Sequence, residues 1–150
     1  MLLRIKDLIP SDKLAIVREI LDSAQFVDGK FSAGKEAVSV KNNEELPQDH
    51  PEMGKLNTIV MGHLVNHPTY KYGVLPHRIA APFYARYRAG KQYGKHVDDP
   101  IMGIGDSYRT DVSITVFLNE PNEYEGGELT ISSQHGEIRN KFSAGDAILS

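Results

Sequence analysis

Residues 109–119, RTDVSITVFLN, carry the clearest strand pattern in the chain. Successive side chains of an extended strand point to opposite faces, so the alternation separates two sets of residues. The apolar face consists of Val112, Ile114, Val116 and Leu118. The other face is mostly polar and consists of Asp111, Ser113, Thr115, Phe117 and Asn119. The pattern predicts a β-strand that buries one face and leaves the other for a different purpose.

The residues after this strand predict further short strands. Residues 128–132 and 137–142 flank a turn at 134–136 and resemble a hairpin. A last apolar run, residues 147–150, follows a turn at 144–146 and reaches the end of the sequence. An unpaired hydrophobic strand leaves a sheet edge that attracts other chains, so we expect these 150 residues to be a fragment of a longer protein.

Upstream of the central strand the pattern is extended but less regular. Residues 79–87 are extended in character, and Gly90 marks a turn before residues 93–98. Residues 99–108 contain proline and two glycines, which predicts a loop.

Two amphipathic patterns in the first half predict helices. The first can be capped by Ser11 or Asp12, and the second begins near Pro51 and ends before Pro68. Their apolar stripes are, in order, Leu14, Val17, Leu21 and Ala24, and Met53, Leu56, Val60 and Leu64. A short strand is expected within residues 35–43.

Helices followed by short antiparallel strands indicate the α+β class, with a sandwich or barrel as the main body. We expect residues 1–76 to form a helical region with short strands that packs on the barrel, and residues 77–150 to form the barrel itself. The two regions together are expected to make one structural domain.

The composition of the chain excludes several classes of function. The chain has 17 basic and 20 acidic residues and a net charge of −3, which gives no general bias toward nucleic acid. It contains no cysteine, which excludes disulfides, thiolate metal sites and a cysteine nucleophile. No apolar run approaches the roughly 20 residues that span a bilayer, and the first residues are too charged for a signal peptide. We therefore expect a cytoplasmic protein without nucleic-acid or membrane partners.

The triplet His96-Val97-Asp98 presents an imidazole and a carboxylate two residues apart. On an extended strand both would point to one face and could reach the same metal ion. With a second histidine they would complete the facial triad of non-haem Fe(II) oxygenases. Taken alone, the triplet fits a surface pair at a strand end better, so its meaning depends on the sequence around it.

Several blocks of sequence surround this triplet in a defined order. They are Arg86-Tyr87-(x)2-Gly90-(x)2-Tyr93-(x)2-His96-Val97-Asp98, Arg109-Thr110-Asp111, Val116-Phe117-Leu118, Tyr124-Glu125-Gly126-Gly127-Glu128-Leu129 and Ala144-Gly145-Asp146. Their order and spacing resemble the prolyl-4-hydroxylase-like branch of the Fe(II)/2-oxoglutarate dioxygenases, and most closely the bacterial PKHD-type hydroxylases. Val27-Asp28-Gly29 and Val40-Lys41-Asn42-Asn43 also look like that subgroup, so the resemblance covers nearly the whole chain.

The resemblance implies a double-stranded β-helix, or jelly roll, preceded by helices and with a metal at the mouth of the barrel. It implies Fe(II) as cofactor, 2-oxoglutarate and O2 as cosubstrates, and ascorbate as the reductant that keeps iron reduced. Oxidative decarboxylation of 2-oxoglutarate to succinate and CO2 would be coupled to hydroxylation of a C–H bond.

Residue by residue, His96 and Asp98 match the first two metal ligands of such enzymes. Tyr87 lies where relatives place a tyrosine that binds 2-oxoglutarate, and Phe117 lies on the strand face that borders the cosubstrate. The polar residues beside Phe117 suit a pocket better than a packed core. No catalytic residue beyond the metal ligands is implied. Simpler interpretations remain open, with Tyr87 and Tyr93 as barrel aromatics.

Residues 41–43 and Arg109 also have more than one interpretation. Lys41-Asn42-Asn43 could line the pocket entrance or form a solvated loop. Arg109 is more simply explained by a salt bridge to Asp111 or another acidic residue than by a substrate contact.

The sequence departs from the family at its end. The family's distal histidine ligand follows the strand that would begin at Ala147, and a basic residue further on pairs with the distal carboxylate of 2-oxoglutarate. Neither occurs within the chain. The other histidines fit loops, turns or helix ends; they are His50, His63, His67, His77 and His135. We therefore expect the chain itself to have impaired activity.

Two alternative functions stay open at this point. One is a catalytically silent jelly-roll module that binds metal, and the other is a cupin-like metalloenzyme that does not use 2-oxoglutarate. The hydroxylation substrate, whether small molecule, peptide or protein, is not identified by the sequence, and a homodimer is compatible with it.

Overall fold

The computed structural model describes residues 2–32 and 37–150. The helices are α1 (Ser11–Ser23), α2 (Met53–Asn66) and α3 (Pro68–Gly73), with a 3₁₀ turn η1 (Gly29–Ser32). The strands of the first half are β1 (Leu3–Ile5), β2 (Val27–Asp28), β3 (Lys41–Asn42) and β4 (Glu44–Glu45). Those of the second half are β5 (Ala85–Arg86), β6 (Gln92–Tyr93), β7 (Ile101–Met102), β8 (Tyr108–Arg109), β9 (Ile114–Val116), β10 (Leu129–Ser133), β11 (Gly136–Asn140) and β12 (Ala147–Leu149).

The last strand lies in the middle of a sheet. β12 pairs antiparallel with β1 on one side and with β9 on the other, and all three of its residues are buried. The expectation of an unpaired apolar strand at an exposed edge was therefore wrong. Its partner β1, Leu3–Ile5, is too short to show a periodic pattern, and the sequence did not predict it.

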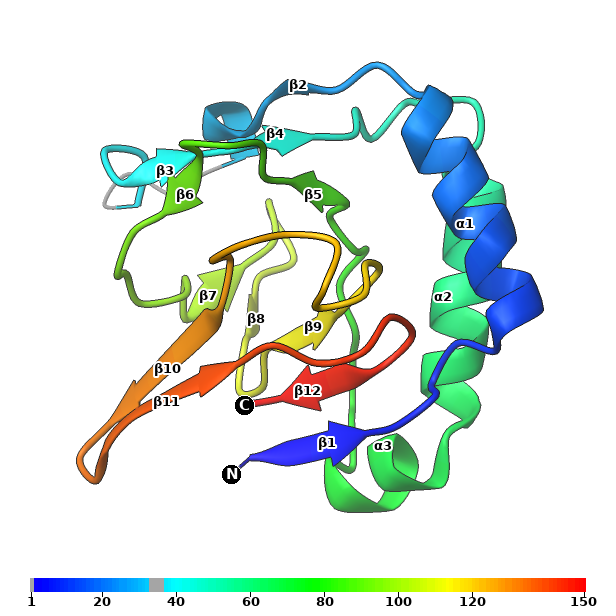
Figure 1. Cartoon of the computed structure of the whole chain (residues 1–150). Coiled ribbons are helices and arrows are strands. Elements are labelled where there is room, and N and C mark those ends of the chain that lie inside the picture. The colour runs from blue at the N-terminus through cyan, green and yellow to red at the C-terminus, as the bar shows by residue number, and fades with distance from the viewer. Residues whose placement is uncertain (1, 33–36) are drawn as a thin grey trace.

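Helices α1 and α2 run along one side of this sheet and cover it (Figure 1). The predicted stripe of α2 is confirmed, because Met53, Leu56, Val60 and Leu64 are all buried. The apolar face of the 109–119 segment packs against the same core, which also confirms the predicted division of its two faces. Burial of apolar surface between helices and sheet is therefore the main stabilising contact of the fold.

The start of α1 differs from the expected one, and the short helix α3 was not predicted. The residue before α1 is Pro10, and no side chain caps the helix, so Ser11 and Asp12 lie inside its first turn instead. Helix α2 ends before Pro68 as predicted, but Pro68 itself starts α3. Proline suits a first helical turn, and the ring of His67 accepts a hydrogen bond from the amide of Thr69, which caps this short helix.

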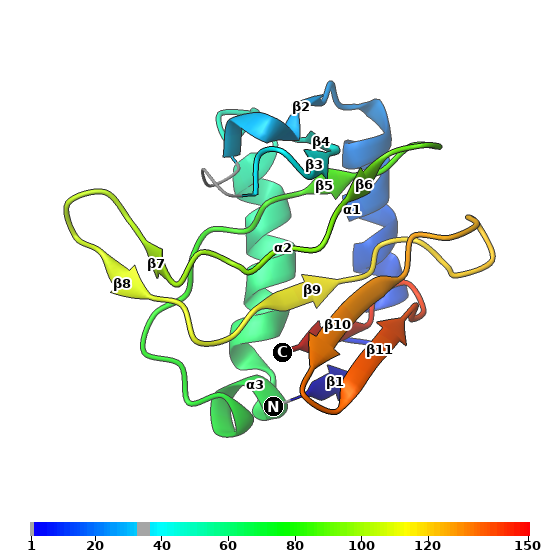
Figure 2. The same ribbon diagram turned by 90° about the vertical axis from the view of Figure 1, so that its left-hand side faces the viewer.

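The remaining strands form small antiparallel sheets. Their orders are β2-β4-β5, β3-β6, β7-β8 and β10-β11. The hairpin β10-β11 is the one predicted from the sequence, whereas the β7-β8 hairpin projects from the body where a loop was expected (Figure 2). The α+β class is confirmed, and the arrangement is of the jelly-roll type, although the sheets of the described residues do not close into a barrel.

Several predicted strands are shorter than their sequence patterns. In the 109–119 segment only Ile114–Val116 and Arg109 are in strands, although paired hydrogen bonds between Ser113 and Ser150 continue the ladder. In the 79–87 segment only Ala85–Arg86 is a strand. The alternation of apolar and polar residues predicts which face of a segment is buried. A strand also requires hydrogen bonds to the backbone of a neighbouring strand, and much of each segment has no such neighbour among the described residues.

The expected strand within residues 35–43 is largely a turn. Residues 37–40 form a turn, and only Lys41–Asn42 is in a strand. Residues 35–36 lie outside the described part of the chain. Within residues 2–32 and 37–150, the structure contains no helix with the length and apolar character needed to cross a membrane.

Candidate metal and cosubstrate site

His96 and Asp98 come together in the segment that follows β6. The Nε2 atom of His96 lies 3.3 Å from Oδ1 of Asp98. Two ligands that each stand about 2.1 Å from an octahedral ion are separated by about 3.0 Å, so both atoms could bind one ion after a small adjustment. Residues 94–100 have no regular strand, however, and the expected strand geometry of the triplet was wrong.

The tautomer of His96 suits a metal ligand. Its Nδ1 atom lies 2.7 Å from the carbonyl oxygen of Gly94, and a carbonyl can only accept, so Nδ1 carries the proton. The lone pair of the neutral ring is then on Nε2, the atom that faces Asp98. Metal-binding histidines usually donate their other N–H to a backbone carbonyl in this way. The His96 side chain is 23% exposed and that of Asp98 is 62% exposed, which leaves the pair accessible.

The imidazole of His96 stacks on the ring of Tyr93. The ring centroids are 3.7 Å apart and the planes differ by 11°. Burial raises the pKa of Tyr93, and the negative charge of Asp98 and the nearby Tyr87 and Glu45 raise it further. Tyr93 therefore stays protonated and neutral beside the candidate ligand.

Tyr87 belongs to the same group of residues. Its hydroxyl oxygen accepts a hydrogen bond of 3.1 Å from the side-chain amide of Asn43. Burial of the phenol raises the pKa of Tyr87, the Asn43 hydrogen bond acts in the opposite direction, and the charge of Glu45 raises the pKa again. The hydroxyl thus keeps its own proton, which it can donate to an anion in the site.

Phe117 lies elsewhere. It is buried, and its ring meets that of Phe142 edge-on, with centroids 5.4 Å apart. The guanidinium group of Arg4 lies 4.0 Å above the Phe142 ring. No aromatic contact among the described residues joins this cluster to the one formed by Tyr93 and His96.

Three other histidines make local contacts. The Nδ1 atoms of His50 and His67 accept backbone amides two residues ahead, and Nδ1 of His63 lies 2.6 Å from the Ile59 carbonyl oxygen. His135 is in the exposed turn between β10 and β11. Within residues 2–32 and 37–150, no group of three histidine, aspartate or glutamate side chains is placed to hold a metal ion. Arg109 forms the simple salt bridge to Asp111, at 2.6 Å.

A buried polar cluster next to Tyr93 was not predicted. Lys41, Asn43 and Glu45 are only 6%, 2% and 7% exposed. The Lys41 ammonium group pairs with Glu45 and donates a 2.7 Å hydrogen bond to Ser32, whose hydroxyl in turn donates to Glu45. The interpretation of residues 41–43 as a solvated loop was thus wrong for Lys41 and Asn43.

The hydropathy pattern does not predict this cluster, because both faces of its strands are polar. Residues 41–45 read Lys-Asn-Asn-Glu-Glu, and alternate members point inward, yet hydropathy cannot distinguish them. Gly29 was the available signal. A Cβ atom there would lie 1.9 Å from Oδ1 of Asn43, so only glycine lets that buried amide approach the backbone.

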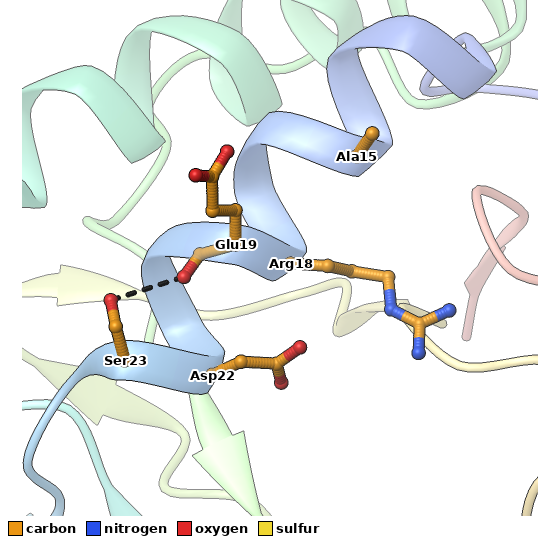
Figure 3. Close-up of a pocket in the computed structure, with 5 residues that line it drawn as sticks. All are labelled: Ala15, Arg18, Glu19, Asp22 and Ser23. Carbon is orange, nitrogen blue, oxygen red and sulfur yellow. Dashed lines mark hydrogen bonds between the residues drawn. The ribbon is translucent and has the colours of Figure 1, made fainter.

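A surface depression on α1 offers no comparable chemistry. Figure 3 shows its lining residues, Ala15, Arg18, Glu19, Asp22 and Ser23, along one side of the helix. The Ser23 hydroxyl donates to the carbonyl of Glu19, and Arg18 pairs with Glu123. The segment between β6 and β7, which carries His96, lies on the side of the molecule away from α1 (Figure 1).

Comparison with known proteins shows the family to which the chain belongs. The model of the 2OG-Fe(II) oxygenase superfamily matches residues 82–149, a range that includes His96 and Asp98. A PKHD-type hydroxylase of Thioalkalivibrio sulfidiphilus is 46% identical over 150 residues, which are 99% of this chain and 67% of the relative. Those of Hyphomonas neptunium and a Polaromonas species are 43% and 44% identical with the same coverage. The chain therefore belongs to the PKHD-type hydroxylases, a group of dioxygenases that depend on Fe(II) and 2-oxoglutarate and consume O2.

Proposed function

We propose that His96 and Asp98 hold the Fe(II) ion of a hydroxylase that couples decarboxylation of 2-oxoglutarate to hydroxylation of a C–H bond in a substrate yet to be identified. The observation that carries the proposal is the approach of His96 Nε2 to Asp98 Oδ1, at 3.3 Å, with Nδ1 committed to the Gly94 carbonyl. When bound, Fe(II) supplies the oxidising chemistry together with 2-oxoglutarate and O2.

The chain's own contribution is to orient ligands and bind the cosubstrate. The Gly94 carbonyl fixes the tautomer of His96, so Nε2 is the unprotonated nitrogen that would bind the metal. Tyr87 is proposed to donate its hydroxyl proton to a carboxylate of 2-oxoglutarate, because Asn43 already occupies the oxygen as a donor. A cosubstrate role for Phe117 stays a prediction of the resemblance.

Among residues 2–32 and 37–150, no third side chain is placed to complete the ligand set. Two protein ligands should hold a divalent ion much more weakly than three, and the distal carboxylate of 2-oxoglutarate needs a basic partner. This chain spans 67% of the length of the relatives it matches. We propose that a distal histidine and a basic residue complete the site outside residues 1–150, and that the chain alone has impaired activity. Ascorbate is proposed to maintain the reduced iron.

Metal binding tests the two ligands directly. Titration of the chain with Mn(II), followed by the loss of the free-ion EPR signal, should show weak binding that His96→Ala abolishes and Asp98→Asn weakens. His135→Ala is the matched control, since that histidine is exposed in a hairpin turn, and it should bind Mn(II) as the unaltered chain does. Equal affinity in the His96→Ala and unaltered chains would remove His96 from the site.

Cosubstrate binding tests Tyr87 separately. Calorimetric titration of the Mn(II)-loaded chain with 2-oxoglutarate should show about tenfold weaker binding in Tyr87→Phe, the usual loss for a hydrogen bond to a charged group. Tyr108→Phe, in the β7-β8 hairpin, serves as the control. Formation of succinate with Fe(II) and ascorbate, in a longer form of the protein that carries a third ligand, then tests turnover. A three-ligand protein that releases no succinate would argue for a silent metal-binding module.

A further inference from the structure

The segment that carries His96 has little backbone support of its own. Residues 94–100 form no regular strand, so no hydrogen-bonded ladder orients the imidazole. Besides the approach of Nε2 to Asp98, the ring contacts the Gly94 carbonyl through Nδ1 and the Tyr93 ring through its face. Tyr93 is the last residue of β6 and Gly94 follows it, and β6 pairs with β3. The orientation of His96 therefore depends on how β3 holds the end of β6.

The backbone of β3 fixes Gly94. The Gly94 amide donates a 2.8 Å hydrogen bond to the carbonyl of Val40, the residue before β3. A Cβ atom at position 94 would lie 3.0 Å from Cβ of Val40, closer than side-chain carbons normally approach. Glycine thus permits this close contact, and the contact determines where the carbonyl that holds His96 points.

A side chain of β3 fixes Tyr93. Lys41 is directly opposite Tyr93 in the antiparallel register, and its Nζ atom lies 5.2 Å from the centre of the Tyr93 ring. A lysine side chain ordinarily samples many rotamers. Here Glu45 and Ser32 hold the ammonium group in a buried position, so the cation over the ring is fixed.

The burial of this ion pair needs an explanation other than stability. Desolvation offsets most of the attraction between two buried charges, so apolar residues of similar size are often as stabilising. A buried pair can instead specify one arrangement of its neighbours. The neighbour that Lys41 reaches is Tyr93, and through it His96.

We infer that Tyr93 and the buried Lys41–Glu45 pair are positioning residues, which hold the His96 imidazole with Nε2 turned toward the metal. This role rests on the proposed function, since it supposes that His96 is a ligand. It assigns a purpose to a buried charged cluster that contains neither of the two candidate metal ligands. Of the two groups, Tyr93 acts by direct stacking and the ion pair acts through Tyr93.

The first experiment removes the stacked ring. In Tyr93→Leu we expect Mn(II) affinity to fall about tenfold, the lower end of the usual effect of losing a contact that orients a ligand. In the metal-free chain, long-range ¹H–¹⁵N NMR should show that the Nδ1–H tautomer of His96 no longer predominates. Tyr93→Phe keeps the stack and should restore both properties.

Tyr124→Leu is the matched control for this variant. Lys141 lies over the Tyr124 ring at 4.1 Å, so the same kind of contact is removed in a different loop. This control should leave both the His96 tautomer and Mn(II) affinity unchanged. If Tyr93→Leu also leaves both unchanged, the positioning role of Tyr93 is wrong.

The second experiment replaces both members of the ion pair, so that neither charge is left buried without its partner. Lys41→Met/Glu45→Met should weaken Mn(II) binding about threefold, the size of an ordinary cation–π contact, and loosen the tautomer preference of His96. Unchanged affinity and tautomer in the folded double variant would show that the pair has no positioning role. Unchanged Mn(II) affinity in His96→Ala would contradict the proposed function instead, while the tautomer measurement in the metal-free chain would still judge Tyr93.

Discussion

In the sheet β1-β12-β9, apolar side chains from three strands pack against α1 and α2, and two of the paired strands, β1 and β12, come from opposite ends of the chain. Around β3 and β6 the contacts are mostly polar. A buried ion pair, a hydroxyl, an amide and two tyrosines make these contacts, and one of the tyrosines, Tyr93, stacks on His96. Hydrophobic burial stabilises the first region, whereas hydrogen bonds and charges, with Lys41, Asn43 and Glu45 buried among them, organise the second.

The two kinds of contact differ in what they specify. An apolar core tolerates the exchange of one apolar residue for another of similar size and shape. In a buried polar network, all hydrogen bonds are formed in only a few arrangements of the side chains. A site that must present one imidazole nitrogen to a metal benefits from the second kind. We therefore expect substitutions in the sheet to change stability alone, and substitutions around β3 to change stability and metal binding together.

The largest effect is expected for Lys41→Met. The variant leaves Glu45 charged, 7% exposed and without its lysine, and loss of one partner of a buried pair costs about 3–5 kcal/mol. Denaturant unfolding measures the change. The double variant Lys41→Met/Glu45→Met should recover most of this stability. A single variant no less stable than the double one would mean that Glu45 is solvated in solution.

A somewhat smaller effect is expected for Leu149→Ala in β12. Leu149 is fully buried, and truncation leaves a cavity that costs about 3 kcal/mol. Once folded, this variant should bind Mn(II) with unchanged affinity, because β12 belongs to the helix-backed sheet. Ile104→Ala, at a fully exposed position of the β7-β8 hairpin, is the control and should stay within about 0.5 kcal/mol of the parent. Weakened Mn(II) binding in folded Leu149→Ala would show that the helix-backed sheet and the region around His96 are not independent.

Gly29→Ala tests the polar region with the smallest possible change. The new Cβ atom would collide with Oδ1 of Asn43, and overpacking of this kind costs about 2 kcal/mol. Displacement of Asn43 should also release the Tyr87 hydroxyl and weaken 2-oxoglutarate binding to the Mn(II)-loaded chain.

The matched control is Gly54→Ala on α2, where an added methyl meets no atom within 4 Å. It should slightly stabilise the helix, since alanine is the better helix former. Equal stability of the two alanine variants would show that Asn43 adapts without cost.

The sequence predicted the apolar region well because its signal is periodic. The stripe of α2 and the two faces of residues 109–119 follow directly from spacing, and both are confirmed. The exception is β1, whose three residues are too few to show a period. Its pairing with β12 depends on a contact between the two ends of the chain, and local patterns carry no information about such contacts.

The polar region was predicted only in part. The proximity of His96 and Asp98 follows from their spacing, although the backbone between them is not a strand. Lys41, Asn43 and Glu45 could not be recognised as buried, because hydropathy assigns all three to the surface. Their burial depends on partners that lie 4 to 44 residues away, Lys41 with Glu45 and Asn43 with Tyr87.

The smallest effect is expected at the exposed rim of the polar region, where Glu44 lies on the opposite face of β4 from the buried cluster. Its carboxylate accepts hydrogen bonds from Arg86 at 3.0 Å and from Arg88 at 3.1 Å. The Arg86 hydrogen bond is the main cause that holds the pKa of Glu44 below its ordinary value of 4.5. Because the pKa is lower in the folded protein, the stabilising contribution is present above pH 4.5 and is lost as the pH falls through the folded-state pKa.

Glu44→Gln should therefore be less stable than the parent at neutral pH and approach it as the pH falls below about 4.5. Urea unfolding midpoints at a series of pH values measure this convergence. Asp22→Asn, an equally conservative change on the exposed side of α1, should show no such trend, since no ion pair involves Asp22 among the described residues. Mn(II) affinity should not change in Glu44→Gln, because its arginine partners lie outside the group that holds His96. A parallel loss of Mn(II) binding would extend the positioning network to the outer face of β4.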